Sequence, residues 1–377
     1  MKILHVVNQL SLGGTEKTAI NFCQKLQQSN DVKLFSFAGG IRHSECLLKL
    51  GRVVLGNGND LQNEIKSFNP NIIHIHRGGW QDDQMLGPIA VLKDEHKFKI
   101  VETNIFGDAD RGKFGKSIDL HLFVSNYVLK YYQTSTLGEL NNEHKLNFLY
   151  NPIKSPAIPD KDYWKIISRQ SFGIPDDAVV FGRIGRPDNH HGVMHNAIQK
   201  CWRDGKKYYL ICLCPTNEML NMWKNNKLVK LVTNPIVDEI ELTKFYYTID
   251  GLLHDRTDGE TFGCGLAEAM IHGVPCISHI SRKYQAQIET MSFNKNAALK
   301  CIGVKPESIV FKDSRSLKVD GGFITRLNDS DEYARCIDRL LEEFKDEERT
   351  ALCLKSYLSY DSQDVIGNRL IEFYVNL

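Results

Sequence analysis

Two glutamates eight positions apart mark the segment of this sequence that is best equipped for chemistry. Glu260 and Glu268 enclose a glycine-rich turn in "DGETFGCGLAEAMIHGVPCIS", residues 258–278. We expect the apolar residues after Gly265 to form a short helix. The first N–H groups of a helix have no intrahelical partner and attract anions, and Gly263 and Gly265 let a phosphate approach the backbone closely. The segment therefore predicts a phosphate at the start of a helix.

The two carboxylates indicate what surrounds that phosphate. A phosphate repels a neighbouring carboxylate, so Glu260 is better suited to accept hydrogen bonds from a hydroxyl-rich group than to add affinity for the anion. Glu268 lies about one turn into the expected helix, where it can reach the two hydroxyls of a ribose. A sugar and a ribose on either side of a pyrophosphate describe a nucleotide-sugar. The structural alternative is an ordinary helix start with a solvated glutamate.

The segment from Glu260 to Glu268, with the "AMIHGVPCIS" that follows, resembles the E-x7-E signature of retaining glycosyltransferases of the GT-B fold, the large family 4 group. The likeness includes both glutamates, the Phe-Gly pair, the Glu-Ala-Met run and Gly-x-Pro. It implies that Glu260 contacts the transferred sugar and that Glu268 holds the ribose. It also implies that backbone amides from Gly263 to Leu266 bind the diphosphate.

A second segment, "GRPDNHHG", follows the apolar run "AVVF" and resembles the family's G-R-x-x-x-x-K-G, in which an arginine and a lysine neutralise the diphosphate. Arg186 matches the arginine, and its fixed guanidinium suits a pyrophosphate. His191 stands at the lysine position. Because the ordinary pKa of histidine is near 6.5, donor binding should rely on Arg186 or depend on pH. Arg183 is the second candidate for the arginine role.

Two segments near the N-terminus complete the resemblance. "SLGGTE" is similar to the family's glycine loop, which faces the donor phosphates and the acceptor, and it contains Gly13 and Gly14. "VETNIFG" ends an expected strand where many relatives carry a histidine that touches the transferred sugar. Thr103 and Asn104 are the candidates here, with a structural turn as the alternative.

These segments give a full set of expected site residues. The residues expected to act in catalysis are Glu260, Arg186 and Asn104. The residues expected to bind the donor are Gly13, Gly14, Arg183, His191, Phe262, Gly263, Cys264, Gly265, Leu266 and Glu268. The resemblance implies transfer with retention and without an essential divalent metal. In "HIHRGG", His74 and His76 share a strand face, but no carboxylate or cysteine accompanies them, so we expect no metal site.

The elements that must position these residues alternate between apolar strands and helical or loop segments. Near-continuous apolar strands separated by helices indicate parallel sheets covered on both faces. The expected strands are 2–7, 31–40, 71–79, 98–104, 120–126, 206–215, 227–234, 248–255 and 273–279, with a further strand and glycine turn in "AVVFGRIG".

The proline-rich "NPIKSPAIPD" interrupts this rhythm and is the best linker candidate. We therefore expect an α/β protein with two Rossmann-like, doubly wound domains that face each other across a cleft, the GT-B fold. Residues 1–152 would form the acceptor domain and 153–361 the donor domain, and a helix over about 362–377 would pack back on the first domain.

Composition narrows the functional classes. The 377 residues are 42% hydrophobic and 25% charged with a net charge of +1, so no basic excess points to a general nucleic-acid binder. The ten cysteines are scattered, often within apolar runs, which suits reduced thiols. The sequence shows neither a signal-peptide pattern nor an apolar run long enough to span a bilayer. These features predict a cytoplasmic protein, and the resemblance implies an enzyme without a tightly bound cofactor.

Several alternatives remain open at this stage. A sugar-nucleotide epimerase shares the fold, and a silent sugar-binding scaffold is conceivable because His191 replaces lysine. Phosphorylases of this fold are much longer, and an NAD-dependent dehydrogenase would need a G-x-G-x-x-G fingerprint. The donor is expected to be a UDP- or GDP-linked hexose-type sugar. Its acceptor (a glycan, a lipid or a small molecule), the oligomeric state and any peripheral membrane contact are left undecided.

Overall fold

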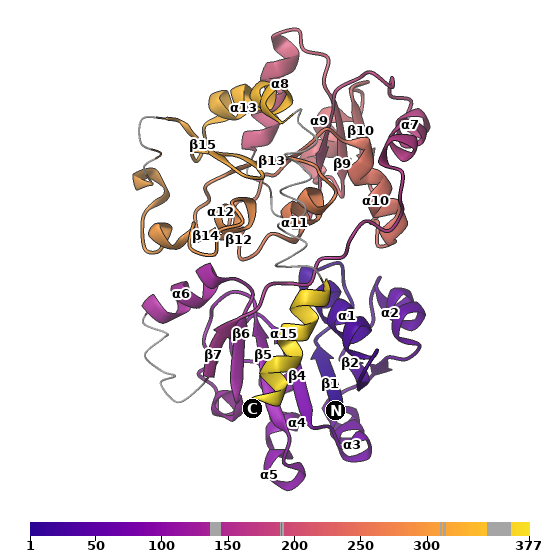
Figure 1. Cartoon of the computed structure of the whole chain (residues 1–377), viewed down its shortest axis with the longest axis vertical. Coiled ribbons are helices and arrows are strands. Elements are labelled where there is room, and N and C mark those ends of the chain that lie inside the picture. Colours follow the sequence, from indigo (N-terminus) through magenta and orange to yellow (C-terminus); the bar gives the residue numbers. More distant parts are fainter. Residues whose placement is uncertain (136–144, 189, 191, 310, 312–313, 345–362) are drawn as a thin grey trace. The chain divides into compact units, whose positions relative to one another are not determined.

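The computed structural model describes residues 1–135, 145–188, 190, 192–309, 311, 314–344 and 363–377 (Figure 1). The chain divides into two compact units. The first unit comprises Met1–Ile153 and Tyr360–Leu377, and the second comprises Lys154–Ser359.

The first unit is built on a parallel sheet with the order β3-β2-β1-β4-β5-β6-β7. Its described strands are β1 (Lys2–Val7), β2 (Asp31–Ser36), β3 (Val54–Leu55), β4 (Ile72–Arg77), β5 (Lys99–Asn104), β6 (Leu120–Phe123) and β7 (Lys145–Phe148). Winding starts at β1, proceeds outward through β2 and β3, and then resumes on the other side at β4. The carboxyl ends of β1 and β4 therefore flank the topological switch point of this sheet.

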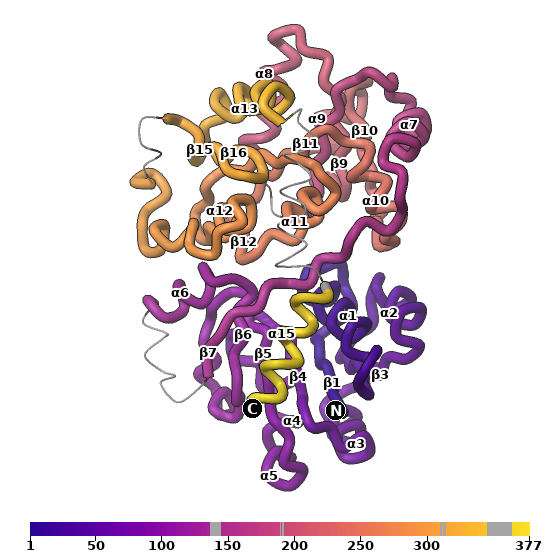
Figure 2. The backbone as a smooth tube through the Cα atoms, viewed as in Figure 1, coloured from indigo at the N-terminus to yellow at the C-terminus, as the bar shows by residue number. Residues whose placement is uncertain are grey.

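Helices cover the faces of this sheet. They are α1 (Gly14–Leu26), α2 (His43–Leu50), α3 (Gly58–Phe68), α4 (Asp83–Ala90), α5 (Lys93–His96), α6 (Asn126–Thr134) and α15 (Gln363–Val375). The distant α15 runs alongside α1 (Figure 2). A Lys25–Asp364 ion pair of 2.7 Å and a contact between the Tyr374 hydroxyl and His74 tie it to this unit.

The second unit repeats the arrangement in the order β10-β9-β8-β11-β13-β16-β15. Its described strands are β8 (Val180–Arg183), β9 (Tyr209–Leu213), β10 (Val229–Val232), β11 (Gly251–Leu253), β13 (Cys276–His279), β15 (Ser316–Val319) and β16 (Gly322–Thr325). Neighbouring strands are parallel except β15, which pairs antiparallel with β16 at one edge. The switch point of this sheet lies between β8 and β11.

The helices of the second unit alternate with these strands. They are α7 (Lys161–Ser171), α8 (Val193–Arg203), α9 (Asn217–Trp223), α10 (Glu239–Thr248), α11 (Cys264–Ile271), α12 (Ala286–Met291) and α13 (Ser330–Glu343). A small separate sheet joins β12 (Gly259–Glu260) to β14 (Tyr284–Gln285). The expectation of two doubly wound α/β domains is confirmed by the two sheets.

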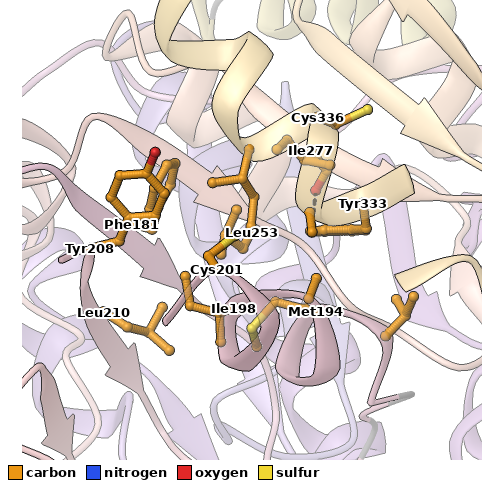
Figure 3. Close-up of a cluster of buried hydrophobic side chains, with 14 of the residues drawn as sticks. Phe181, Met194, Ile198, Cys201, Tyr208, Leu210, Leu253, Ile277, Tyr333 and Cys336 are labelled. Atoms are coloured by element: carbon orange, nitrogen blue, oxygen red, sulfur yellow. Dashed lines mark hydrogen bonds between the residues drawn. The ribbon is translucent and has the colours of Figure 1, made fainter. Parts of the chain in front are cut away.

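One hydrophobic cluster of the second unit lies between its sheet and the helices α8 and α13 (Figure 3). The Tyr333 hydroxyl on α13 crosses this cluster and donates to the backbone carbonyls of Ile277, at 2.9 Å, and His254, at 3.1 Å. These bonds fix the carboxyl end of β11, where the candidate site begins. In the part of the chain that the structure describes, none of the helices is long and apolar enough to cross a membrane.

Candidate functional site

The segment after β11 carries the E-x7-E motif and lies at the switch point of the second sheet. The described residues after β8, namely 184–188, 190 and 192, lie on the other side of that point. Ligands of open α/β sheets bind outside the carboxyl ends of the strands at such points. Topology therefore brings both sequence motifs to one edge of one sheet.

The helix α11 begins with a backbone suited to an anion. Its N-cap is Gly263, with a left-handed φ of 94°, a conformation that glycine adopts at little cost. No side chain of the described residues caps this helix start. The first amides of an α-helix have no intrahelical partner, so those of Gly265 and Leu266 are candidates to bind a ligand. A Cβ on Gly265 would come 3.2 Å from Ile184, so the segment after β8 packs on this helix start. The buried Phe262 precedes it, and its carbonyl accepts from Thr290 at 2.5 Å.

Two nitrogen-bearing side chains that precede Glu260 in the sequence contact its carboxylate. His254 Nε2 lies 3.0 Å from Glu260 Oε1, and Arg256 Nη1 donates to Oε2 at 3.2 Å. Burial alone raises the pKa of Glu260, but Arg256 and His254 outweigh it and lower this pKa to about 2. The backbone N–H of Glu260 donates to Gln287 at 3.2 Å. Glu260 is therefore an ionised, fixed hydrogen-bond acceptor.

The sequence interpretation missed His254 and Arg256. Their signal lies in "HDRTDGE", where a histidine and an arginine stand six and four positions before the glutamate. His254 Nδ1 lies 2.8 Å from Ser278 Oγ on β13. The imidazole thus connects two adjacent strands to the carboxylate of Glu260.

Glu268 is buried on α11 and faces α10. The Tyr246 hydroxyl donates to Glu268 Oε2 at 3.0 Å. Burial and the adjacent carboxylate raise the pKa of Tyr246 well above its ordinary value, so its hydroxyl keeps its proton and remains a donor. Sequence patterns did not reveal Tyr246 as a residue of this site either, because none of the recognised motifs lies within or next to α10.

The two arginines after β8 have different environments. The side chain of Arg186 is 54% exposed, with Nε 3.4 Å from Asp188 Oδ1. Arg183 is only 2% exposed. Its guanidinium donates to four backbone carbonyls, those of Gly185, Arg186, Leu213 and Cys214. Arg183 therefore shapes the loop that presents Arg186, while its own donors are directed at the protein. His191 lies outside the described residues.

Asp255 occupies the start of the other helix at this edge. Its Oδ2 accepts from the backbone N–H groups of Gly192, at 2.9 Å, and Met194, at 3.1 Å, at the N-terminus of α8. His279 Nε2 lies 3.3 Å from Oδ1, and His190 Nδ1 lies 3.2 Å from Oδ2. Burial raises the pKa of Asp255, but hydrogen bonds and these histidines lower it well below its usual range. A fixed carboxylate at α8 leaves the start of α11 as the better position for a phosphate.

The glycine loop of the first unit is arranged differently. Gly13 is the N-cap of α1, but a Cβ there would come 2.3 Å from Glu16 Oε2. Ser11 Oγ donates to Glu16 Oε1 at 2.9 Å. This buried carboxylate lies beside Gly13 at the start of the helix that Gly14 opens, where it disfavours a phosphate.

Asn104 is buried at the end of β5 and binds its own loop. Its amide donates to Glu102 at 3.2 Å and to the carbonyl of Asp108 at 2.9 Å, and its oxygen accepts from the Gly107 N–H at 2.9 Å. Thr103 Oγ1 lies 2.8 Å from His74 Nε2. Both side chains are thus in contacts within the first unit. These contacts correspond to a structural role for Thr103 and Asn104, which was the alternative considered from the sequence.

The structure adds a third histidine to the pair noted in the sequence. His5 on β1 pairs in register with His74 on β4, and ligand atoms of His5, His74 and His76 lie within 4.8 Å of one another. The sequence argument considered only carboxylates and cysteines as further ligands and did not include His5. However, both nitrogens of His74 already contact Tyr374 and Thr103, at 2.6 and 2.8 Å.

The rings of His74 and His76 also stack at 4.3 Å with an interplanar angle of 21°. Near-parallel rings do not aim their in-plane nitrogen lone pairs at a common point, as a metal requires. His5 Nδ1 instead lies 2.9 Å from His76 Nε2. Burial lowers the pKa of all three histidines, that of His5 to about 3. The cluster is a hydrogen-bonded group of neutral imidazoles.

No protein-family model and no curated protein matches this sequence. Solved structures do match it. A glycosyltransferase from Rickettsia africae has 16% identity and a TM-score of 0.72, covering 100% of this chain and 98% of that one. Anabaena Alr3699/HepE in complex with UDP has 14% identity and a TM-score of 0.71, with full coverage of both chains.

A UDP-GlcNAc 2-epimerase from Neisseria meningitidis, bound to UDP-GlcNAc, also matches over both full chains, with 12% identity and a lower TM-score of 0.57. At such identities the likeness establishes the fold and not the activity. The chain has two parallel-sheet, Rossmann-like α/β domains, the GT-B fold of these glycosyltransferase structures.

Proposed function

We propose that this protein is a retaining glycosyltransferase that moves a hexose-type sugar from a UDP-sugar to a hydroxyl acceptor. The observation that carries the proposal is the start of α11, which lies between Glu260 and Glu268 at the switch point and has no side-chain cap among the described residues. The fold likeness to HepE, which has been solved with UDP-glucose, supports UDP as the first nucleotide to test.

Each part of the donor has a matching group in the second unit. The diphosphate would accept hydrogen bonds from the first amides of α11, and the exposed Arg186 would add a bidentate cation. Glu268, oriented by Tyr246, would accept from the ribose hydroxyls. Glu260, oriented by His254, would accept from a hydroxyl of the transferred sugar.

In the proposed reaction the bond between the anomeric carbon and the diphosphate oxygen breaks as the acceptor oxygen bonds to the same face of that carbon. The departing phosphate oxygen takes the acceptor proton. The amides of α11 and Arg186 would stabilise the negative charge that develops on the diphosphate. Because Glu260 is ionised, it orients the sugar and does not act as an acid. The scheme requires neither a side-chain nucleophile nor a metal.

A donor screen tests this function. Thermal unfolding and the release of nucleoside diphosphate would be measured with UDP-, GDP-, ADP- and dTDP-glucose, with and without EDTA. We expect selective stabilisation by the UDP-sugar and slow UDP release that survives EDTA. Glu268→Gln should weaken both effects, while Glu95→Gln, a change at a 72% exposed side chain of the first unit, should preserve them. A wild-type protein stabilised by none of the four would contradict the proposal.

The second candidate is an epimerase, favoured by the His254–Glu260 pair as an acid and base, and by the fold likeness to the Neisseria enzyme. The low pKa of Glu260 argues against it as a proton donor. Proton NMR of the incubated UDP-sugar separates the two reactions. An epimerase yields a second UDP-sugar, whereas a transferase yields UDP and a sugar or glycoside. Binding without either product would indicate a silent sugar-binding scaffold.

A further inference from the structure

An exposed tryptophan stands at the carboxyl edge of the first sheet. Trp80 follows β4, which adjoins β1 at the switch point of this sheet. This residue is 51% exposed. An aromatic residue of this size is usually buried for most of its surface, so a half-exposed indole at a ligand-binding edge requires an explanation.

Trp80 stacks on a second aromatic ring. The ring of Phe106, which follows β5, lies 5.6 Å from the indole with an interplanar angle of 16°. The two loops are also joined through their backbones, because the Phe106 N–H donates to the Gly78 carbonyl at 3.2 Å. We call Trp80 and Phe106 the aromatic pair. Phe106 supports the indole, and the exposed half of Trp80 remains for a ligand.

A buried ion network fixes the loop of the aromatic pair. Arg77 donates to the Trp80 carbonyl at 2.9 Å, to Glu102 at 2.6 Å and to Asp110 at 2.6 Å. The side chains of these three charged residues are at most 2% exposed, and His121 also contacts Glu102. Burying charges is costly unless they are well paired. The network therefore holds the loop that carries Trp80 in one conformation.

Glycine at position 78 restricts the loop further. A Cβ on Gly78 would come 1.9 Å from the indole of Trp80, so the backbone and the ring are in direct contact. A ring held in place before binding loses little conformational entropy when a ligand arrives. The aromatic pair is thus preorganised for contact with a flat, partly apolar partner.

The residues that directly follow Trp80 carry an amide and two carboxylates, those of Gln81, Asp82 and Asp83. Asn8 donates to Asp82 at 2.9 Å, and Gln81 donates to Asp83 at 2.8 Å. Such groups bind hydroxyls well and disfavour phosphates and other anions. An aromatic face beside amides and carboxylates fits a pyranose, whose C–H face is apolar and whose edge carries hydroxyls.

We propose that Trp80, supported by Phe106, binds a pyranose ring of the saccharide that accepts the transferred sugar. This inference rests on the proposed transferase function and names its acceptor class as a neutral saccharide. The alternative partner for the exposed indole of Trp80 is a membrane surface, since the nearby loop contains the basic residues Arg111, Lys113 and Lys116. The experiment must separate the two.

A glycan array of neutral oligosaccharides would be probed with the full-length wild type, Trp80→Ala, Trp80→Phe and Tyr163→Ala. Tyr163 is a matched control, because it is 52% exposed and packs on Trp164 in the second unit. Wild type, Trp80→Phe and Tyr163→Ala should bind the same glycans, and Trp80→Ala should bind them about tenfold more weakly. Unchanged binding by Trp80→Ala, or no glycan binding by the wild type, would overturn the proposal.

Two further measurements make the outcomes distinguishable. The UDP-induced thermal shift should be the same in all four proteins; its absence in all of them would contradict the transferase function, whatever the array shows. Co-sedimentation with vesicles of phosphatidylcholine and phosphatidylglycerol tests the membrane. Vesicle binding that is lost in Trp80→Ala would make Trp80 a membrane anchor and overturn the saccharide assignment.

Discussion

The imidazole of His254 positions the carboxylate of Glu260. Its Nε2 lies 3.0 Å from Glu260 Oε1, while Nδ1 lies 2.8 Å from Ser278 on the next strand of the sheet. Arg256 Nη1 donates to the other carboxylate oxygen at 3.2 Å, so donors on both oxygens orient Glu260. The first prediction concerns this pair.

His254→Asn should shift the pH dependence of the reaction. The pKa of Glu260 is lowered to about 2 by Arg256 and His254, so loss of His254 raises this pKa toward its ordinary value. Activity that needs ionised Glu260 will then fall at a higher pH on the acidic side, with an overall rate about tenfold lower. UDP release from UDP-glucose between pH 4 and 8 measures this. An acidic limb identical to that of the wild type would mean that His254 does not position Glu260.

The two arginines after β8 should differ in what their removal affects. Arg186→Ala should weaken UDP binding about tenfold without changing the melting temperature, because its side chain is exposed. Arg183→Ala should destabilise the protein by about 2–4 kcal/mol, because four carbonyls lose their buried donor. Isothermal calorimetry and urea unfolding distinguish these effects. The opposite pattern would assign the phosphate to Arg183.

Tyr246→Phe should weaken the hydrogen bonds that Glu268 forms with the ribose. The variant removes the hydroxyl that donates to Glu268 at 3.0 Å, which leaves a buried carboxylate with one donor fewer and weakens UDP binding several-fold. The decisive ligand is 2′-deoxy-UDP. The wild type should bind it more weakly than UDP, and this difference should vanish in Glu268→Gln. A difference that persists in Glu268→Gln would place the ribose elsewhere.

Because three histidines are buried, we expect the free energy of unfolding to decrease in mild acid. Burial lowers the pKa values of His5, His74 and His76 in the folded state, whereas the unfolded chain titrates near 6.5. Below that pH the unfolded state binds more protons, so stability is full above about pH 6.5 and decreases as the pH falls toward the folded pKa values. Each histidine contributes up to about 1.4 kcal/mol per pH unit.

Urea unfolding at pH 7.5 and pH 5.5 measures this dependence. The double variant His5→Gln, His76→Gln should reduce the difference between the two midpoints. Tyr374→Phe, which removes a contact of His74, should lower stability at both pH values by about 1 kcal/mol. A wild type with equal midpoints at both pH values would show that these histidines do not titrate on unfolding.

Part of this structure could be predicted from sequence because its signals are local. β1 spans Lys2–Val7, as expected, because a strand buried on both faces is nearly continuously apolar. The start of α11 could be predicted for a similar reason, since Gly263 and the two glutamates lie within nine residues. The short β3 and the antiparallel β15 were missed, because edge strands are brief or half-exposed and lack that signal.

The remaining features depend on tertiary structure. Arg183 and Arg186 carry the same charge, so the sequence does not distinguish them. The difference arises in the fold, where Arg183 donates to carbonyls of β9 and the loop that follows it. His5 joins His74 because β1 pairs with β4, a register that no local pattern contains. Asn104 ends its strand as expected, but the contacts of its amide depend on Glu102 and on the turn that follows.

The place of α15 in the first unit has a consequence for biosynthesis. Tyr374 lies 300 positions after its partner His74, and the whole of Lys154–Ser359 separates the two parts of the first unit. At about 5–20 residues per second, the ribosome needs on the order of tens of seconds to make that insert. During this interval we expect the second unit to be able to fold completely, while the histidine-bearing face of the first sheet waits for its covering helix. The domain that begins first is therefore the one that finishes last.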